Sequence, residues 1–481
     1  MSKVCADCIG ESYLREQIMQ NGGVGHCDYC QSKENPTIDL DDLAEQVHAV
    51  LGENFYMTSP DPEGIDLLAA KEGYWEQPGE PVTDVIMNLI DSSEELAEAV
   101  REYLSDQYDP WGKDAIVDPC PYASDSQHEE RAIDTYEFQE SWTSFRREIL
   151  SRSRFFNQAA KSALEHLFQG VAQLVTHDGE PVVRVLGPAD SIFRARLAKS
   201  NDALGEILKA TPGSLGAPPG RYASAGRMNA EGISVFYGAT NIHTCIAEIR
   251  APVGGYVAIG RFVPLRELRL LDLTRLGKVF LQGSFFDAKH MESLSRVHFL
   301  KQLESELSQP VMPGSESRDY LPTQVVAEYL ATHPDMELDG VMFASSQVAL
   351  EEEEDTDTQE QQGKNVVLFS HACGLEKYDV PDGIEIEVNR HLGDPDDPDH
   401  SIWIWERVPD TPEIEERAPA LDTVFDLWTP VHASALPEEQ DNPSIRLDME
   451  SIEVRRIEGV TYQTFSFNVF RHRSNAKDSK F

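Results

Sequence analysis

Residues 226–250, GRMNAEGISVFYGATNIHTCIAEIR, decide the fold expected for the second half of this 481-residue chain. The pattern predicts a short, strand-like segment interrupted by glycines, with Tyr237 at the end of an apolar run. Glu248 stands between apolar neighbours, where a carboxylate is costly unless it has a partner or a chemical task. We therefore treat Arg227, Tyr237 and Glu248 as candidate functional residues.

The chain is long enough for two or three domains. It has 84 acidic and 41 basic residues, a net charge of -43 that disfavours nucleic acid as a general partner. The most acidic run, Glu351–Gln362, is expected to be a disordered loop. No apolar run reaches the roughly 18 residues of a membrane span, and the first residues lack the apolar core of a signal peptide. We expect a cytoplasmic protein.

Four of the seven cysteines form two C-x2-C pairs, Cys5 with Cys8 and Cys27 with Cys30. Their separation is typical of a zinc ribbon, in which four thiolates bind one structural Zn²⁺. Residues 1–35 are therefore predicted to form a zinc-ribbon-like segment whose stability comes mainly from the metal. The alternative is a chance pairing of free thiols.

Residues 38–170 have apolar residues at helical spacing and predict a helical domain. Ser92 and Ser93 indicate that a second helix begins within the periodic stretch 85–103. The segment 107–125 contains three prolines and is predicted to be a loop. The helices are expected at Asp39–Leu51, Val85–Tyr103, Trp142–Ile149 and Phe156–Phe168, the last ending near Gly170.

From residue 181 the pattern changes to short β-like runs separated by turns. Residues 181–381 therefore predict a β-rich α+β domain, and residues 382–481 a β-rich extension with a polar insertion at Leu392–His400. The expected strands are Pro181–Leu186, Ile233–Tyr237, Tyr256–Val263, Gly340–Ala344, Asn365–Ser370 and part of Ser451–Arg473, with helices at Lys289–Leu307 and Gln324–Ala331. The chain as a whole is predicted to be a multi-domain α+β protein.

The segment 226–250 resembles the RES domain, a family named for Arg, Glu and Ser residues. The resemblance continues in sequence order through GRFVP at 260–264, RLLDLT at 269–274, YLPTQ at 320–324, DGVMFASS at 339–346 and GKNVVLF at 363–369. It covers roughly 190 residues. The acidic insert at 351–362 departs from the family pattern, and we expect it to cover or regulate the site.

The resemblance implies an ADP-ribosyltransferase-like fold and an enzyme that degrades NAD⁺. Some RES domains use phosphate as the acceptor, and some act as toxins paired with an antitoxin. Arginine suits the NAD⁺ pyrophosphate because its planar fork binds phosphate oxygens and stays charged, so Arg227, and second Arg194, are expected to bind substrate. Glu248 would stabilise the oxocarbenium-like state at the ribose.

Four further residues receive roles from the same resemblance. Tyr237 would stack on nicotinamide or orient the ribose, and Ser345 would donate a hydrogen bond to phosphate or to the carboxamide. Gln324 and Asn365 would line the cleft. Without the resemblance, Arg227 and Glu248 would most simply form a structural ion pair. Tyr237 would then be a core residue and Ser345 an ordinary strand end.

The helical region resembles the HEPN-type domain that precedes some RES domains. Catalytic HEPN domains carry an Arg followed four to six residues later by His, and residues 38–170 have no such pair. The sequence therefore favours a scaffolding or regulatory role over ribonuclease activity.

Three functions remain open at this point. The first is cleavage of NAD⁺ at the nicotinamide–ribose bond with phosphate as acceptor, controlled by residues 1–170, the 351–362 loop or a separate antitoxin. The second is ADP-ribose transfer to a protein or nucleotide. The third is a degenerate RES domain that serves as a binding module.

Overall fold

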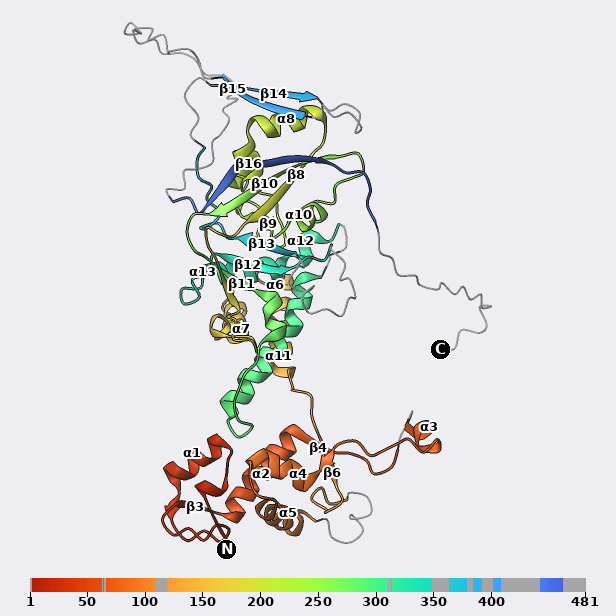
Figure 1. Ribbon diagram of the computed structural model, residues 1–481, viewed down its shortest axis with the longest axis vertical. Helices are drawn as coiled ribbons and strands as arrows, with labels where there is room; N and C mark the ends of the chain where they lie inside the picture. Colours follow the sequence, from red (N-terminus) through yellow and green to blue (C-terminus); the bar gives the residue numbers. More distant parts are fainter. Residues whose placement is uncertain are drawn as a thin grey trace. The chain divides into compact units, whose positions relative to one another are not determined.

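The computed structural model describes residues 2–62, 64, 66–109, 119–309, 311, 314–347, 363–378, 384–391, 401–407 and 442–461 (Figure 1). It divides into two compact units. The first unit is Met1–Ser144 with Val279–Leu303, and the second is Phe145–Lys278 with Glu304–Phe481. The predicted acidic loop at 351–362 and the polar insertion at 392–400 lie outside the described residues.

The first unit begins with a small sheet that carries the cysteines, in the strand order β1-β3-β2. Val4, Ile9 and Leu14 are buried in one core with Leu43 and Val47 of the following helix. Residues 1–35 were expected to depend mainly on a metal, and the structure adds that they also bury apolar side chains in a core shared with the following helices. The elements are β1 (Lys3–Cys5), η1 (Ala6–Cys8), α1 (Ser12–Asn21), β2 (Gly23–Val24) and β3 (Pro36–Asp39).

The helices of the first unit follow the predicted periodicity. The predicted break is confirmed, since Asp91 adopts a left-handed φ of 47° and the Ser93 hydroxyl accepts a 3.4 Å hydrogen bond from the Leu96 amide. Asp39–Leu51 is confirmed by α2. The elements are α2 (Leu40–Asn54), α3 (Asp66–Lys71), α4 (Val82–Ile90) and α5 (Glu94–Tyr108), with the three-stranded sheet β4 (Phe55–Met57), β6 (Gln127–Glu130) and β5 (Glu80–Pro81).

Two helices, α6 (Tyr136–Ser151) and α11 (Ala288–Ser308), contribute residues to both units. Both were predicted in outline. The prediction that Phe156 extends the next apolar stripe is wrong, because α7 (Gln158–Phe168) begins after it and Phe156 is 98% exposed. Gly170 follows α7 with a φ of 72°, as a residue that ends a helix does.

The second unit is built on an eight-stranded sheet in the order β16-β10-β8-β9-β13-β12-β11-β7 (Figure 1). Among the described strand pairs only β11 and β12 are parallel. β8 and β9 are joined by a single register pair, Phe193 with Ala239, so the sheet narrows there. The strands are β7 (Val183–Leu186), β8 (Ile192–Ala198), β9 (Phe236–Ala239), β10 (Tyr256–Pro264), β11 (Leu268–Asp272), β12 (Gly340–Ala344), β13 (Lys364–Leu368) and β16 (Ile445–Arg456).

The segment 226–250 is only partly strand. β9 is its one strand, and the helix α10 (Ile242–Glu248) follows, capped by the Asn241 side chain, which accepts from the Thr244 amide at 2.8 Å. The strand-like prediction overlooked a helical signal, which is the helical spacing of the apolar residues at 242, 245, 246 and 249. α10 packs against β8, β9 and β13.

The remaining elements surround this sheet. β14 (Glu385–His391) and β15 (Ser401–Arg407) form a separate hairpin beside α8 (Figure 1). β16 belongs to the main sheet, which confirms the predicted final strand as far as Arg456, while residues 462–473 lie outside the described part. The others are α8 (Asn201–Lys209), α9 (Thr211–Leu215), α12 (Glu316–Asp319), α13 (Leu321–Thr332), η3 (Val171–Gln173), η4 (Gly220–Tyr222) and η5 (Leu273–Lys278).

The fold is mixed α+β, as predicted. In the part of the chain that the structure describes, every helix is too short or too polar to span a lipid bilayer.

Candidate functional site

Glu248 ends α10 and is held by two side chains that were predicted to share its cleft. Its Oε1 atom accepts hydrogen bonds from Ser345 Oγ at 2.6 Å and from Asn365 Nδ2 at 2.7 Å. Ser345 follows β12 and Asn365 lies on β13, so residues about 100 positions apart meet where β12 ends and the antiparallel β13 begins, near α10. The Glu248 side chain is exposed, which corrects the expectation that it sits in apolar surroundings.

Arg227 does not pair with Glu248. Its Nη1 atom donates to the Leu307 carbonyl at 2.7 Å, and its guanidinium lies 5.3 Å from the centre of the Tyr320 ring. Within the described residues Arg227 has no carboxylate partner, so the structural ion pair is wrong. Its charge is available for an anion.

Tyr237 and Gln324 hold the turn that carries Arg227. The Tyr237 hydroxyl donates to Asn229 Oδ1 and accepts from the Met228 amide, both at 2.9 Å. Gln324 Nε2 donates to the Gly226 carbonyl at 2.8 Å. Burial raises the pKa of Tyr237 to about 12, so its hydroxyl stays protonated at neutral pH. These polar atoms are thus used within the turn, the Tyr237 hydroxyl by the Met228 amide and the Asn229 side chain, and Gln324 Nε2 by the Gly226 carbonyl.

Gly226, Asn229 and Thr323 were missed by sequence reasoning. A Cβ atom on Gly226 would lie 2.7 Å from the Tyr237 hydroxyl oxygen, so this close approach requires glycine. Thr323 Oγ1 donates to the Arg227 carbonyl at 2.6 Å. The only sequence signal for the Thr323 contact is the motif that precedes Gln324, since Thr323 and Arg227 are nearly 100 residues apart.

Arg194 lies on β8 with its guanidinium 4.9 Å from the centre of the Phe236 ring. Its Nη1 atom is buried and has no hydrogen-bond partner among the described residues. Burial lowers the pKa of Arg194 to about 10, so the side chain is still charged at neutral pH. A buried charge without an acceptor is costly, and an anionic ligand would satisfy it.

The charges of these groups act on two buried side chains, Tyr237 on β9 and Cys245 on α10. Burial raises the pKa of Tyr237, and the positive charges of Arg227 and Arg194 offset part of that rise. The pKa of Cys245 on α10 is raised to about 12, mainly by burial. The charge of Arg194 offsets part of this rise, and the charge of Glu248 adds to it. The two arginines and the carboxylate therefore act on a common region around β9 and α10.

Arg250 is a further residue that the sequence reasoning missed. It follows α10 with a left-handed φ of 47°, a conformation that costs energy for a residue other than glycine. Its Nε donates to Gln347 Oε1 at 3.1 Å, and the Gln347 amide donates to Ser345 Oγ at 3.2 Å. Within the described part of the chain it has no carboxylate partner, and its guanidinium lies at the edge of the Glu248 cluster.

The first unit holds a second cluster, formed by Cys5, Cys8, Cys27 and Cys30. Their sulfur atoms all lie within 4.8 Å of one another, with pairs at 3.4, 3.7 and 3.8 Å. Four sulfurs about 2.3 Å from a tetrahedral Zn²⁺ would be about 3.8 Å apart, so the spacing fits that ion. Burial and the neighbouring thiols raise the pKa of Cys5 and Cys8, whereas backbone amides from Cys30, Tyr29 and Cys5 lower the pKa of Cys27 to about 6, so Cys27 ionises first.

Two models of known families match separate parts of the chain. Residues 20–163 match the HEPN/RES N-terminal domain 1, and residues 196–388 match the RES domain. The second match includes Arg227, Glu248, Ser345 and Asn365, and begins two residues after Arg194. No curated protein and no solved structure matches the chain. RES domains are associated with enzymes that act on NAD⁺. The chain therefore carries a RES domain at residues 196–388, preceded by a HEPN/RES N-terminal domain 1 at residues 20–163.

Proposed function

We propose that this chain cleaves NAD⁺ at the nicotinamide–ribose bond and transfers ADP-ribose to phosphate. One observation carries the proposal. A carboxylate fixed by Ser345 and Asn365 belongs to the same unit as three arginines, Arg194, Arg227 and Arg250, for which the described residues offer no carboxylate. In a chain with twice as many acids as bases, such arginines favour a ligand with several negative charges.

Glu248 would stabilise the reacting sugar. Cleavage of the C1″–N bond leaves its electron pair on nicotinamide and positive charge on the ribose, and a fixed carboxylate stabilises that charge. The hydrogen bonds to Oε1 orient the group and leave Oε2 without a partner among the described residues. A phosphate oxygen then forms the new bond to C1″, and no electrons are gained or lost overall.

Arg194 and Arg227 would bind the pyrophosphate, and Arg250 the acceptor phosphate. Arg194 is the strongest candidate, because its buried Nη1 lacks an acceptor. Arg250 stands two residues after Glu248, which suits a group that brings phosphate to the ribose. Tyr237 and Gln324 would act indirectly by fixing the turn of Arg227.

We further propose that Zn²⁺ occupies the four-cysteine cluster in a purely structural role, because four thiolates leave no open coordination position. None of the seven cysteines forms a disulfide, which suits the reducing cytoplasm. Since NAD⁺ loss would harm the host, the enzyme would act as a toxin restrained by a separate antitoxin protein.

The test uses the purified full chain with NAD⁺, in the presence and absence of phosphate. We expect nicotinamide and ADP-ribose 1″-phosphate as products, and a loss of rate of about 100-fold or more in Glu248→Gln. Glu206→Gln, which changes an exposed glutamate on α8, is the matched control. Equal rates in wild type and Glu248→Gln would contradict the proposal. Labelled NAD⁺ that marks a macromolecule would instead support ADP-ribosyl transfer.

A further inference from the structure

The turn between α6 and α7 exposes two adjacent aromatic side chains. Phe155 is 81% and Phe156 is 98% exposed. Isolated apolar residues are common on protein surfaces, but two neighbouring phenyl rings exposed to this extent indicate a contact surface. We name residues 152–157 the Phe knob.

Local hydrogen bonds fix the conformation of the Phe knob. Ser153 Oγ donates to the Phe155 carbonyl at 2.9 Å, and Asn157 Nδ2 donates to the Ser153 carbonyl at 2.9 Å. Asn157 also caps α7 through its Oδ1 atom. Phe156 adopts a left-handed φ of 54°, which is unfavourable for an aromatic residue. The turn is thus ordered with both rings directed away from the core, which lowers the entropic cost of inserting them into a partner.

The Phe knob is also a basic region of an acidic chain. Residues 146–161 contain five basic residues and one acidic residue. Arg152 pairs with Glu148 at 2.7 Å, whereas Arg154 has no ion pair with any described residue. A suitable partner therefore offers an apolar pocket with carboxylates at its rim.

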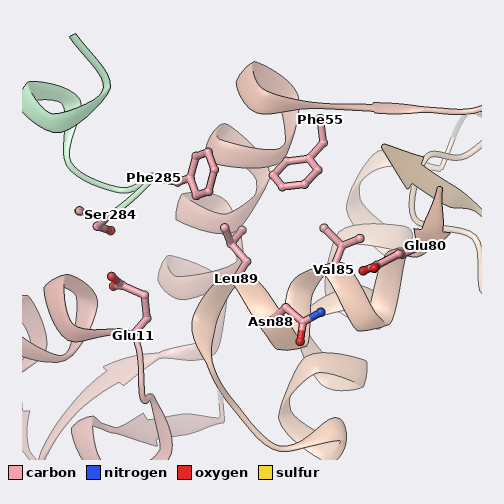
Figure 2. Close-up of a pocket in the computed structure, with 9 residues that line it drawn as sticks. Glu11, Phe55, Glu80, Val85, Asn88, Leu89, Ser284 and Phe285 are labelled. Carbon is pink, nitrogen blue, oxygen red and sulfur yellow. The ribbon is translucent and has the colours of Figure 1, made fainter. Parts of the chain in front are cut away.

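The first unit of this same chain has a pocket of about 280 Å³, in which apolar side chains are joined by the polar side chains of Asn88 and Ser284 and by two carboxylates. Figure 2 shows the rings of Phe55 and Phe285 above Leu89, with the carboxylates of Glu11 and Glu80 on opposite sides. An apolar cavity of about 150 Å³ holds benzene, so this pocket has room for a phenyl ring. Glu80 forms no ion pair with any described residue, and Arg154 would supply one.

We propose that the Phe knob of one copy inserts into the pocket of a second copy. The contact joins two different surfaces. Two copies therefore form a closed dimer where both contacts are made reciprocally, and longer assemblies where they are not. The inference is independent of the NAD⁺ chemistry, because it uses none of the residues around Glu248.

The test measures the mass of the full chain by sedimentation across a wide range of protein concentrations. We expect the mass to rise above the 53.8 kDa of one chain. Replacing both rings in Phe155→Ser/Phe156→Ser should weaken association about tenfold or more. Tyr74→Ser removes a ring that is also 81% exposed and should leave association unchanged.

A charge exchange tests the pairing itself. Arg154→Glu and Glu80→Arg should each weaken association, and the double variant should restore it. Association without this rescue, or a wild-type chain that stays monomeric at every concentration, overturns the inference. So does binding of a single-stranded oligonucleotide by a monomer when that binding is lost in the Phe155→Ser/Phe156→Ser variant.

Discussion

Each of the two units of this molecule contains a set of similar polar side chains without partners of opposite charge among the described residues. The set in the first unit consists of four cysteines and the set in the second of three arginines, and the spacing between the side chains differs between the two sets. In the first unit, four cysteine sulfurs converge within 4.8 Å. In the second, three arginines make separate contacts: Arg194 with Phe236, Arg227 with Leu307, and Arg250 with Gln347. Converging thiols suit one small cation, whereas separated guanidinium groups suit an extended anion. The spacing of unpaired groups therefore indicates the size of the ligand as well as its charge.

The largest expected effect is the loss of the metal from the first unit. Cys27→Ser removes one of four ligands, and structural zinc sites contribute about 10–16 kcal/mol of apparent binding free energy. We expect the variant to lose stoichiometric zinc and to unfold at a much lower temperature. Elemental analysis and calorimetry of the full chain measure both quantities.

Cys120→Ser is the matched control, because Cys120 is a free thiol outside the cluster. It should retain the metal. The shared core moderates the effect of metal loss, since Val4, Ile9 and Leu14 remain buried with the helices. A Cys27→Ser variant with wild-type zinc content would contradict the assignment.

The two clusters also differ in how far sequence could predict them. The cysteine cluster follows from spacing alone, because each pair lies within one tight turn. The contacts of Glu248 with Ser345 and Asn365 required a family resemblance, because they join residues about 100 positions apart. The periodicity of apolar residues was enough to predict elements such as the helix α2 and the strand β10.

The failures have physical causes. The helix α10 was overlooked because its seven residues also contain β-branched side chains that favour strands. Phe156 was assigned to an apolar stripe because periodicity cannot show that a turn precedes the helix. The Tyr237 hydroxyl forms hydrogen bonds with Met228 and Asn229. These two residues lie in a turn, and a periodic pattern of apolar residues does not reveal a turn of this kind.

The next largest effect is expected when Arg194 is replaced. The replacement should raise the stability of the protein and lower its activity. Below a pH of about 10 the folded and unfolded states are both protonated, so the full cost of burying the charge is present at neutral pH. Arg194→Met removes this cost. A gain of about 1 kcal/mol would raise the midpoint of thermal unfolding by about 2–4 °C. Nicotinamide release should fall about 100-fold, because the pyrophosphate loses its buried donor.

Arg196→Met is the control for this prediction. Arg196 is on the same strand but is exposed and donates to the Ser214 carbonyl at 2.6 Å. It should change neither quantity appreciably. ADP-ribose should raise the unfolding temperature of the wild type and not that of Arg194→Met. An Arg194→Met protein that is less stable, or that still responds to ADP-ribose, would show that Arg194 has a structural role.

A smaller effect distinguishes the binding of NAD⁺, which donates ADP-ribose, from the binding of phosphate, which accepts it. Arg250→Gln removes the charge at the edge of the Glu248 cluster while leaving an amide near Gln347. We expect the apparent KM for phosphate to rise about tenfold, with little change in the KM for NAD⁺. Arg221→Gln, an exposed arginine that stacks on Tyr222, is the control. A rise in the KM for NAD⁺ alone would place Arg250 in the nucleotide site.

The smallest effect tests whether a buried nitrogen without a partner always indicates a ligand. His128 on β6 is 5% exposed, and its Nδ1 atom has no hydrogen-bond partner among the described residues. Unlike Arg194, it can lose its proton, and burial lowers the pKa of His128. The unfolded chain therefore takes up a proton near pH 6.5 before the folded chain does, so stability decreases as pH falls through that range.

His128→Asn should weaken this decrease when thermal unfolding is compared at about pH 7.5 and about pH 5.5. His298, whose pKa is also lowered by burial, would account for part of the slope that remains. An unchanged slope would mean that His128 is not the group that titrates. The expected result restricts the ligand argument to groups that cannot become neutral, because a histidine avoids the cost of burial by losing its proton. Arg194 has no such route at neutral pH, and an anion is what remains to offset its charge.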